Sequence, residues 1–174
     1  MSKLLGKKKT AIIASGETFA DALSIGTYAS ENGYPILLVK KNLIPLKISK
    51  SLKDLDIKNV YVIGGNSTID EKVTKQLPKI KERIFGTNRY ETSVMIAKSK
   101  FSESTHAFIS SGNLFSDSLV IGAIGGKHHI PVLLTKQNEA KKTADYIKNS
   151  MINEFTVIGG KTAVNDEIIM KILK

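Results

Sequence analysis

The chain has 174 residues and a mass of 19.0 kDa, which is enough for one ordinary domain or two small ones. Lys and Arg number 26 against 16 Asp and Glu, so the formal net charge of +10 favours a polyanionic partner. Cysteine is absent, which excludes disulfides and thiolate chemistry, and no apolar run approaches the roughly 18 residues of a membrane span.

The sequence contains an internal repeat. Residues 11–40 align with residues 107–136 at a constant offset of 96, and 13 of the 30 pairs are identical. A second match, at an offset of 95, places the Val-Ile-Gly-Gly of residues 62–65 on that of residues 157–160. Because a repeat dictates the architecture, we expect two homologous units.

Each unit predicts the same order of strands and helices. An apolar run that ends in Ser-Gly leads into a helical pattern, and a proline then opens an apolar run of the kind buried on both faces in parallel sheets. The expected strands are at residues 10–14, 35–39 and 59–63 in the first unit and 106–110, 131–135 and 154–158 in the second. The expected helices lie around residues 19–26, 48–55, 70–77, 115–123, 139–150 and 166–173.

Strands that alternate with helices in this way form right-handed βαβ units on a parallel sheet. The predicted fold class is therefore α/β, with two tandem homologous small βαβ modules whose parallel sheets are covered by helices. We place the first module at residues 1–82 and the second at residues 83–174.

The segment between the two units predicts one more helix. Asn88 is followed three residues later by Glu91, a pattern that caps a helix start, and an apolar face then runs through a helix at about residues 89–100. No such segment precedes Ala11. The first unit is therefore either truncated, or permuted so that this helix closes it.

The Ser-Gly turns are the candidate ligand-binding elements. Ser15-Gly16 and Ser111-Gly112 follow strands, so they aim backbone amides at the carboxyl edge of a sheet, where anions bind in open α/β folds. The same glycines are also explained by a purely structural role in the turns. The two Gly-Gly pairs are explained in the same way, as the ends of strands.

The polar and charged residues of the sequence do not indicate a catalytic or metal site. The aspartates Asp21 and Asp117 lack catalytic partners, no histidine pair has metal-ligand spacing, and Ser15 and Ser111 lack the context of a nucleophile. We therefore expect no catalytic residue, no metal and no cofactor. With only two arginines among 26 basic residues and no interleaved aromatics, we also expect no nucleic-acid partner, and we expect no membrane partner.

Four motifs occur in order along the chain, and together they resemble the cell wall binding repeat 2 family of Gram-positive surface proteins. They are Ser-Gly-x-x-Phe-x-Asp-x-Leu, Pro-Ile-Leu-Leu, Val-Ile-Gly-Gly and the linking Asn-Arg-Tyr-Glu-Thr-Ser. The resemblance implies a non-catalytic module, secreted to the cell wall or cell surface as part of a longer protein. Such a module anchors that protein non-covalently to an anionic wall polysaccharide.

The resemblance also implies roles for individual residues. The candidate polymer-binding residues are Arg89, Tyr90, Glu91, Thr92, Ser15, Gly16, Ser111 and Gly112. Arg89 would pair with an anionic group and Tyr90 would stack on a sugar ring. The family's Ile-Leu-Leu anchoring motif matches Ile36, Leu37 and Leu38 and, with valine first, Val132, Leu133 and Leu134. We expect this buried strand to support a site rather than to touch the ligand.

Members of that family commonly carry three copies around a pseudo-threefold axis, whereas two are present here, so self-association could replace the third. Two other functions stay open on the residues alone. One is a small α/β enzyme or cofactor binder that recognises a nucleotide or phosphosugar at the Ser-Gly and Gly-Gly strand ends. The other is a scaffold for protein assembly.

Overall fold

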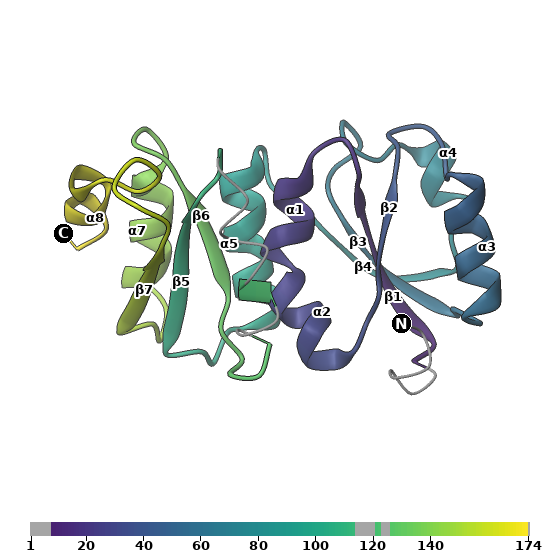
Figure 1. The fold of residues 1–174 in the computed structure, drawn as a ribbon, viewed down its shortest axis with the longest axis horizontal. Helices are drawn as coiled ribbons and strands as arrows, with labels where there is room; N and C mark the ends of the chain where they lie inside the picture. Colours follow the sequence, from purple (N-terminus) through teal and green to yellow (C-terminus); the bar gives the residue numbers. More distant parts are fainter. Residues whose placement is uncertain (1–7, 114–120, 123–125, 174) are drawn as a thin grey trace.

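The computed structural model describes residues 8–113, 121–122 and 126–173 and contains two parallel sheets that lie side by side (Figure 1). The elements of the first repeat are β1 (Thr10–Ser15), α1 (Phe19–Ser24), α2 (Gly26–Asn32), β2 (Ile36–Val39), α3 (Leu46–Asp54), β3 (Asn59–Ile63), α4 (Glu71–Thr74) and β4 (Lys79–Ile84). Then follow α5 (Arg89–Lys100), β5 (His106–Ser111), β6 (Val132–Thr135), α7 (Ala140–Lys148), β7 (Glu154–Ile158) and α8 (Asp166–Ile172). The helix predicted around residues 115–123, with Asp117, lies outside the described residues apart from Ile121 and Gly122.

The two sheets repeat the same topology, which confirms the predicted fold class. The strand order is β2-β1-β3-β4 in the first sheet and β6-β5-β7 in the second, and every pairing is parallel. The register also repeats: Ile12 lies opposite Ile36, and Phe108, which is 96 residues after Ile12, lies opposite Val132. Equivalent residues of the two repeats therefore occupy equivalent places on their sheets.

Apolar layers cover both faces of each sheet. All six residues of β1 and all four of β6 are buried, as expected for continuous apolar strands between helices. On the outer face of the first sheet, Ile13 and Val62 pack with Leu52 of α3 and Val73 of α4. The strands β1 and β6 are therefore enclosed along their length, and a ligand can reach them only at their ends.

The strand β4 was not predicted. It pairs with β3 at the edge of the first sheet, and its first three residues are exposed. Its sequence, Lys-Ile-Lys-Glu-Arg-Ile, has the charged side chains that blunt a sheet edge, so it lacks the apolar run of a central strand. The predicted module boundary after residue 82 falls inside this strand, which stays on the first sheet up to Ile84.

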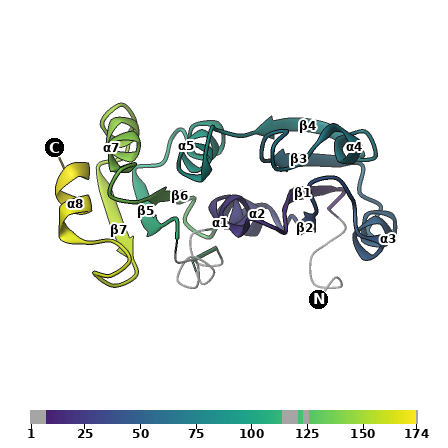
Figure 2. The same cartoon turned by 90° about the horizontal axis from the view of Figure 1, so that it is seen from above.

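The helix α5 joins the two repeats. It follows β4 of the first sheet but lies against β6 and α7 of the second, and it also contacts α1. Figures 1 and 2 both show α1 and α5 between the two sheets. Ile96 packs into the core of the first repeat, whereas Val94 packs into that of the second. At the edge of the second sheet, the Ser93 hydroxyl accepts a hydrogen bond from the Leu134 amide at 3.0 Å.

Close backbone contacts complete the junction between the repeats. Gly26 and its counterpart Gly122 face each other, and a Cβ atom on Gly26 would lie 3.6 Å from the Gly122 Cα. A Cβ atom on Gly126 would lie only 2.8 Å from the Glu31 amide nitrogen and 2.6 Å from the Ser30 Cβ. Glycine is therefore required at Gly126 by the closeness of α2.

Among the described residues, no helix has the length and apolar character needed to cross a membrane.

Candidate functional site

The motif that begins α5 ties a turn to a helix start. The Asn88 side chain accepts hydrogen bonds from the amides of Tyr90 and Glu91 at 3.1 and 3.0 Å, which confirms the predicted cap. The Glu91 carboxylate accepts hydrogen bonds from the amide and the hydroxyl of Thr87, the residue before the cap. These bonds hold the pKa of Glu91 below its usual value. The Thr92 hydroxyl accepts from the Gly86 amide at 3.0 Å.

Tyr90 is buried against the second Ser-Gly turn. It is 4% exposed, and burial raises the pKa of its hydroxyl. A Cβ atom on Gly112 would lie 2.3 Å from the ring, so only glycine allows this approach. The Lys136 ammonium lies 5.2 Å from the ring centre on one side. This geometry does not fit the predicted stacking of Tyr90 on a sugar, because protein atoms already cover the ring.

Arg89 connects the two repeats. Its guanidinium donates to the Gly112 carbonyl at 2.7 Å, which fixes the second Ser-Gly turn. It also lies near Asp21, a carboxylate of α1 that is 7% exposed. Burial raises the pKa of Asp21 to about 6, and the attraction of Arg89 opposes that rise. Asp21 therefore has a charged neighbour, which the sequence did not reveal.

The amides of the first Ser-Gly turn are already occupied. The Gly16 amide donates to the Val39 carbonyl at 2.8 Å, and the Ser15 hydroxyl accepts from the amides of Glu17 and Thr18. In the second repeat, the Gly112 amide donates to Thr135 and the Ser111 hydroxyl accepts from the Asn113 amide. The predicted capture of an anion by these amides therefore does not fit, because the turns use them internally.

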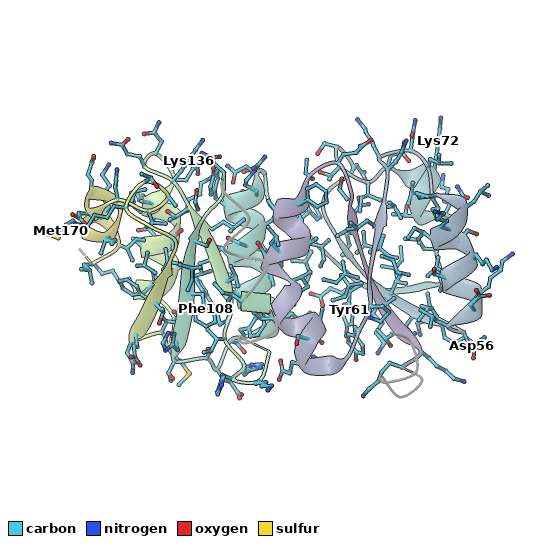
Figure 3. The ribbon with its side chains drawn as sticks, viewed as in Figure 1. Asp56, Tyr61, Lys72, Phe108, Lys136 and Met170 are labelled. Carbon is cyan, nitrogen blue, oxygen red and sulfur yellow. The ribbon has the colours of Figure 1, made fainter. Side chains whose placement is uncertain are left out.

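A pocket of about 460 Å³ lies at the carboxyl edge of the second sheet. It opens where the loops after β5, β6 and β7 meet, which is the place where open α/β sheets bind ligands. Figure 3 shows Lys136 at this edge, beyond the upper ends of the strands. The lining residues are Ser111, Asn113, Lys136, Gln137, Asn138, Thr162, Ala163, Asn165 and Ile168.

This lining suits a polar, negatively charged ligand. It offers hydroxyl and amide groups that both donate and accept hydrogen bonds, together with the ammonium of Lys136, and none of these lining residues is acidic. Two of the amides have neighbours at the rim: Asn113 accepts from the Tyr90 hydroxyl at 3.3 Å, and Gln137 donates to Glu167 at 2.7 Å. Of the predicted residues, only Ser111 lines the pocket, whereas Arg89, Tyr90 and Gly112 lie behind it.

Most of this lining was not predicted from the sequence. Lys136, Gln137 and Asn138 directly follow the strand β6, and Asn165 caps α8 by accepting from the Ile168 amide at 3.0 Å. Their common signal is their position after a strand of a parallel sheet, because all such ends meet at one edge.

The Ile-Leu-Leu segments lie within the sheets, as expected of a supporting element. Leu133 is completely buried and Leu134 is 1% exposed, so their side chains do not reach a ligand. In the first repeat Leu37 is buried, whereas Ile36 and Leu38 are half-buried. The predicted supporting role of Ile36, Leu37, Leu38, Val132, Leu133 and Leu134 fits these positions and stays a prediction.

A larger groove, of about 630 Å³, runs between α5 and α7. Its lining pairs the carboxylates of Glu91 and Asp145 with the ammonium groups of Lys98 and Lys142, so it has no net charge, whereas the lining at the sheet edge has a net positive one. Within the described residues, no group of three or more His, Asp or Glu side chains is arranged to hold a metal ion.

Comparison with known proteins decides the family. The family model of cell wall binding domain 2 (CWB2) matches residues 2–74 and 83–169, one segment in each repeat. The chain belongs to the CWB2 family. This confirms the resemblance seen in the sequence motifs.

Two bacterial proteins illustrate the relationship of this CWB2 chain to curated sequences. The chain is 30% identical over 169 residues to the N-acetylmuramoyl-L-alanine amidase LytC of Bacillus subtilis (strain 168), covering 97% of this chain and 34% of LytC. It is 29% identical over 172 residues to the amidase enhancer of the same organism, covering 97% of this chain and 23% of the enhancer. The chain thus spans about a third or less of these relatives.

Two solved structures share the fold of the CWB2 chain. Cwp8 from Clostridium difficile superposes with a TM-score of 0.79 at 27% identity, covering 99% of this chain and 30% of Cwp8. Cwp6 from the same organism superposes with a TM-score of 0.78 at 27% identity, covering 95% of this chain and 27% of Cwp6. Both paired sheets therefore have counterparts in known proteins.

Proposed function

We propose that this CWB2 chain is a non-catalytic module that holds a protein at the bacterial cell wall or surface by binding an anionic wall polysaccharide. The observation that carries the proposal is the pocket at the carboxyl edge of the second sheet, which combines hydroxyls and amides with Lys136 and has no acidic lining residue. The net charge of +10 adds a long-range attraction for a polyanion. Family membership supports the cell wall as the target.

The residues of the α5 motif position this pocket in the proposed function. Arg89 fixes the Gly112 carbonyl and Tyr90 fills the space behind the same turn, so both determine where Ser111 and Asn113 lie. Glu91 and Thr92 hold the turn before the helix. Arg89 thus acts as a positioning residue rather than as the group that contacts the polymer.

The relatives support a binding role for the matched region. LytC is an amidase by name, but the match covers only 34% of its length, and the match to the amidase enhancer covers only 23%. We infer that the region shared with these proteins is their wall-binding part and that catalysis resides elsewhere in LytC.

Sedimentation of the protein with purified cell walls tests the proposal. We expect the chain to co-sediment with walls of Bacillus subtilis and to lose most of this retention when the anionic polymer is first stripped from the walls. Retention should also fall between 0.1 and 1 M salt, because the screening length shrinks from about 10 Å to about 3 Å. Retention that is unchanged on stripped walls would reject the proposal.

The proposed self-association in place of a third repeat needs a separate measurement. Analytical ultracentrifugation over a range of protein concentrations, with and without the released polymer, distinguishes a monomer from a dimer or trimer. A monomer at every concentration would remove self-association and leave the wall-binding proposal intact.

A further inference from the structure

The first repeat has a counterpart for every residue of the pocket in the second. The equivalent positions follow from the two alignment offsets and from the repeated sheet register. At an offset of 96, Ser111, Asn113, Lys136, Gln137 and Asn138 correspond to Ser15, Glu17, Lys40, Lys41 and Asn42. At an offset of 95, Thr162, Ala163, Asn165 and Ile168 correspond to Ser67, Thr68, Asp70 and Val73. The two edges can therefore be compared position by position.

The two linings differ in charge. The second repeat has amides at Asn113 and Asn165, where the first repeat has the carboxylates Glu17 and Asp70. The lining of the second edge contains one cation and no acid, whereas the first contains two cations and two acids. The lining residues of the second edge therefore carry a net positive charge and those of the first edge carry none, while the Glu167 carboxylate lies outside the lining, bonded to Gln137.

The Glu17 carboxylate also occupies space at the first edge. It accepts a hydrogen bond from the backbone amide of Lys41 at 3.3 Å, in the loop that follows β2. The counterpart of Lys41 is Gln137, in the lining of the pocket. In the first repeat, an internal carboxylate thus lies where an external carboxylate or phosphate oxygen would lie in the second.

The fold does not require the second acid. Asp70 caps α4 by accepting from the amides of Lys72 and Val73, at 2.9 and 3.3 Å. Asn165 caps α8 through the equivalent bond from Ile168 at 3.0 Å. Because asparagine and aspartate cap helices about equally well, the difference in charge is free to serve binding.

We propose that the two repeats have different roles and that each chain binds one anionic sugar group, at the edge of the second repeat. The first repeat is closed to anions by Glu17 and Asp70. This inference rests on the proposed function, since it names the repeat that carries the binding site and the ligand group that it accepts.

Isothermal titration with a size-fractionated anionic polysaccharide, released from Bacillus subtilis walls and cut to short oligosaccharides, tests the inference. We expect a stoichiometry of one for the unmodified chain. Asn113→Glu places a carboxylate in the open pocket and should weaken binding about tenfold or more, because like charges within about 5 Å repel by more than 1 kcal/mol. The double change Glu17→Asn and Asp70→Asn gives the first edge the two amides that the second edge has at these positions and should raise the stoichiometry to two.

Lys136→Gln and Lys40→Gln form a matched pair of changes at equivalent positions that leave the folded core intact. The first should weaken binding severalfold and the second should leave it unchanged. A stoichiometry of two for the unmodified chain, equal effects of the two lysine changes, or a double variant that still binds once would overturn the inference while leaving wall binding in place. Absence of binding by the unmodified chain, in both titration and wall sedimentation, would overturn the proposed function as well.

Discussion

Replacement of Asp21 by asparagine should stabilise the protein at neutral pH. Asp21 lies on α1, between the two repeats, and the residue is 7% exposed. A Cβ atom on Gly64 would lie 3.3 Å from its Oδ2 atom, so the carboxylate packs closely against the end of β3. Its one identified charged neighbour is Arg89, whose attraction does not offset the cost of removing the carboxylate from water.

The pKa gives the size of the effect. Burial raises it from 3.8 to about 6, so the folded protein keeps this proton at pH values where the unfolded chain has released it. The free energy of unfolding therefore falls as the pH rises from about 4 to about 6, and the whole loss amounts to about 3 kcal/mol above that window. Asparagine carries no charge at any pH and avoids this loss.

Urea unfolding at pH 3.5, 5 and 7.5 measures the effect. We expect Asp21→Asn to match the unmodified protein at pH 3.5 and to exceed its free energy of unfolding by about 3 kcal/mol at pH 7.5. The difference between the two proteins cancels other titrating groups, such as Glu91, whose lowered pKa gives the opposite slope. Asp54→Asn, at an exposed position of α3, is the matched control. A variant that is less stable at pH 7.5 would show that the ionised pair with Arg89 is net favourable, contrary to this reasoning.

Three further predictions concern packing, the sheet edge and the arginines. Gly126→Ala should lower the free energy of unfolding by about 1–3 kcal/mol through its clash with α2, whereas Gly160→Ala, with no atom within 4 Å of the added Cβ, should leave it nearly unchanged in the same urea assay. The backbone amides of Phe155 and Val157 should exchange hydrogen at least about tenfold faster than those of Val60 and Val62. The reason is that β3 pairs with β4, whereas no strand among the described residues pairs with the outer side of β7. Equal rates in hydrogen-exchange mass spectrometry would contradict this. Arg83→Lys should cost about 2 kcal/mol or more in urea unfolding, because Arg83 donates to the Gly64 and Ile69 carbonyls and to the Asn66 side chain; a loss below about 0.5 kcal/mol would show that these bonds contribute little.

The repeat made most of the strands predictable. The strands β3 and β7 have the predicted bounds, and β1 and β5 differ from them by one residue. Two copies of one apolar pattern constrain each other, and a run buried on both faces has a clear composition. The edge strand β4 escaped because its exposed lysines follow the rule for edges rather than the rule for cores.

The site was less predictable, because it depends on contacts between repeats. The sequence indicated the Ser-Gly turns and the Arg-Tyr-Glu-Thr motif as candidates, but it could not show that Tyr90 is buried against Gly112. Nor could it show that the turn amides are already bonded. Lys136 and Asn113 could not be predicted as neighbours, because their proximity depends on three loops that meet at one edge of the sheet.

The arginines and the lysines have different roles in this chain. The chain has 26 basic residues, and the two arginines both donate to backbone carbonyls near the carboxyl edges of the sheets: Arg83 to Gly64 and Ile69, and Arg89 to Gly112. A guanidinium suits this role because its several donors lie in one plane, whereas a lysine ammonium is a mobile, strongly hydrated point charge. Arginine thus fixes the fold, and in the proposed function the lysines attract the polyanion. Such attraction is diffuse, so its specificity must come from the neutral amides and hydroxyls that surround Lys136.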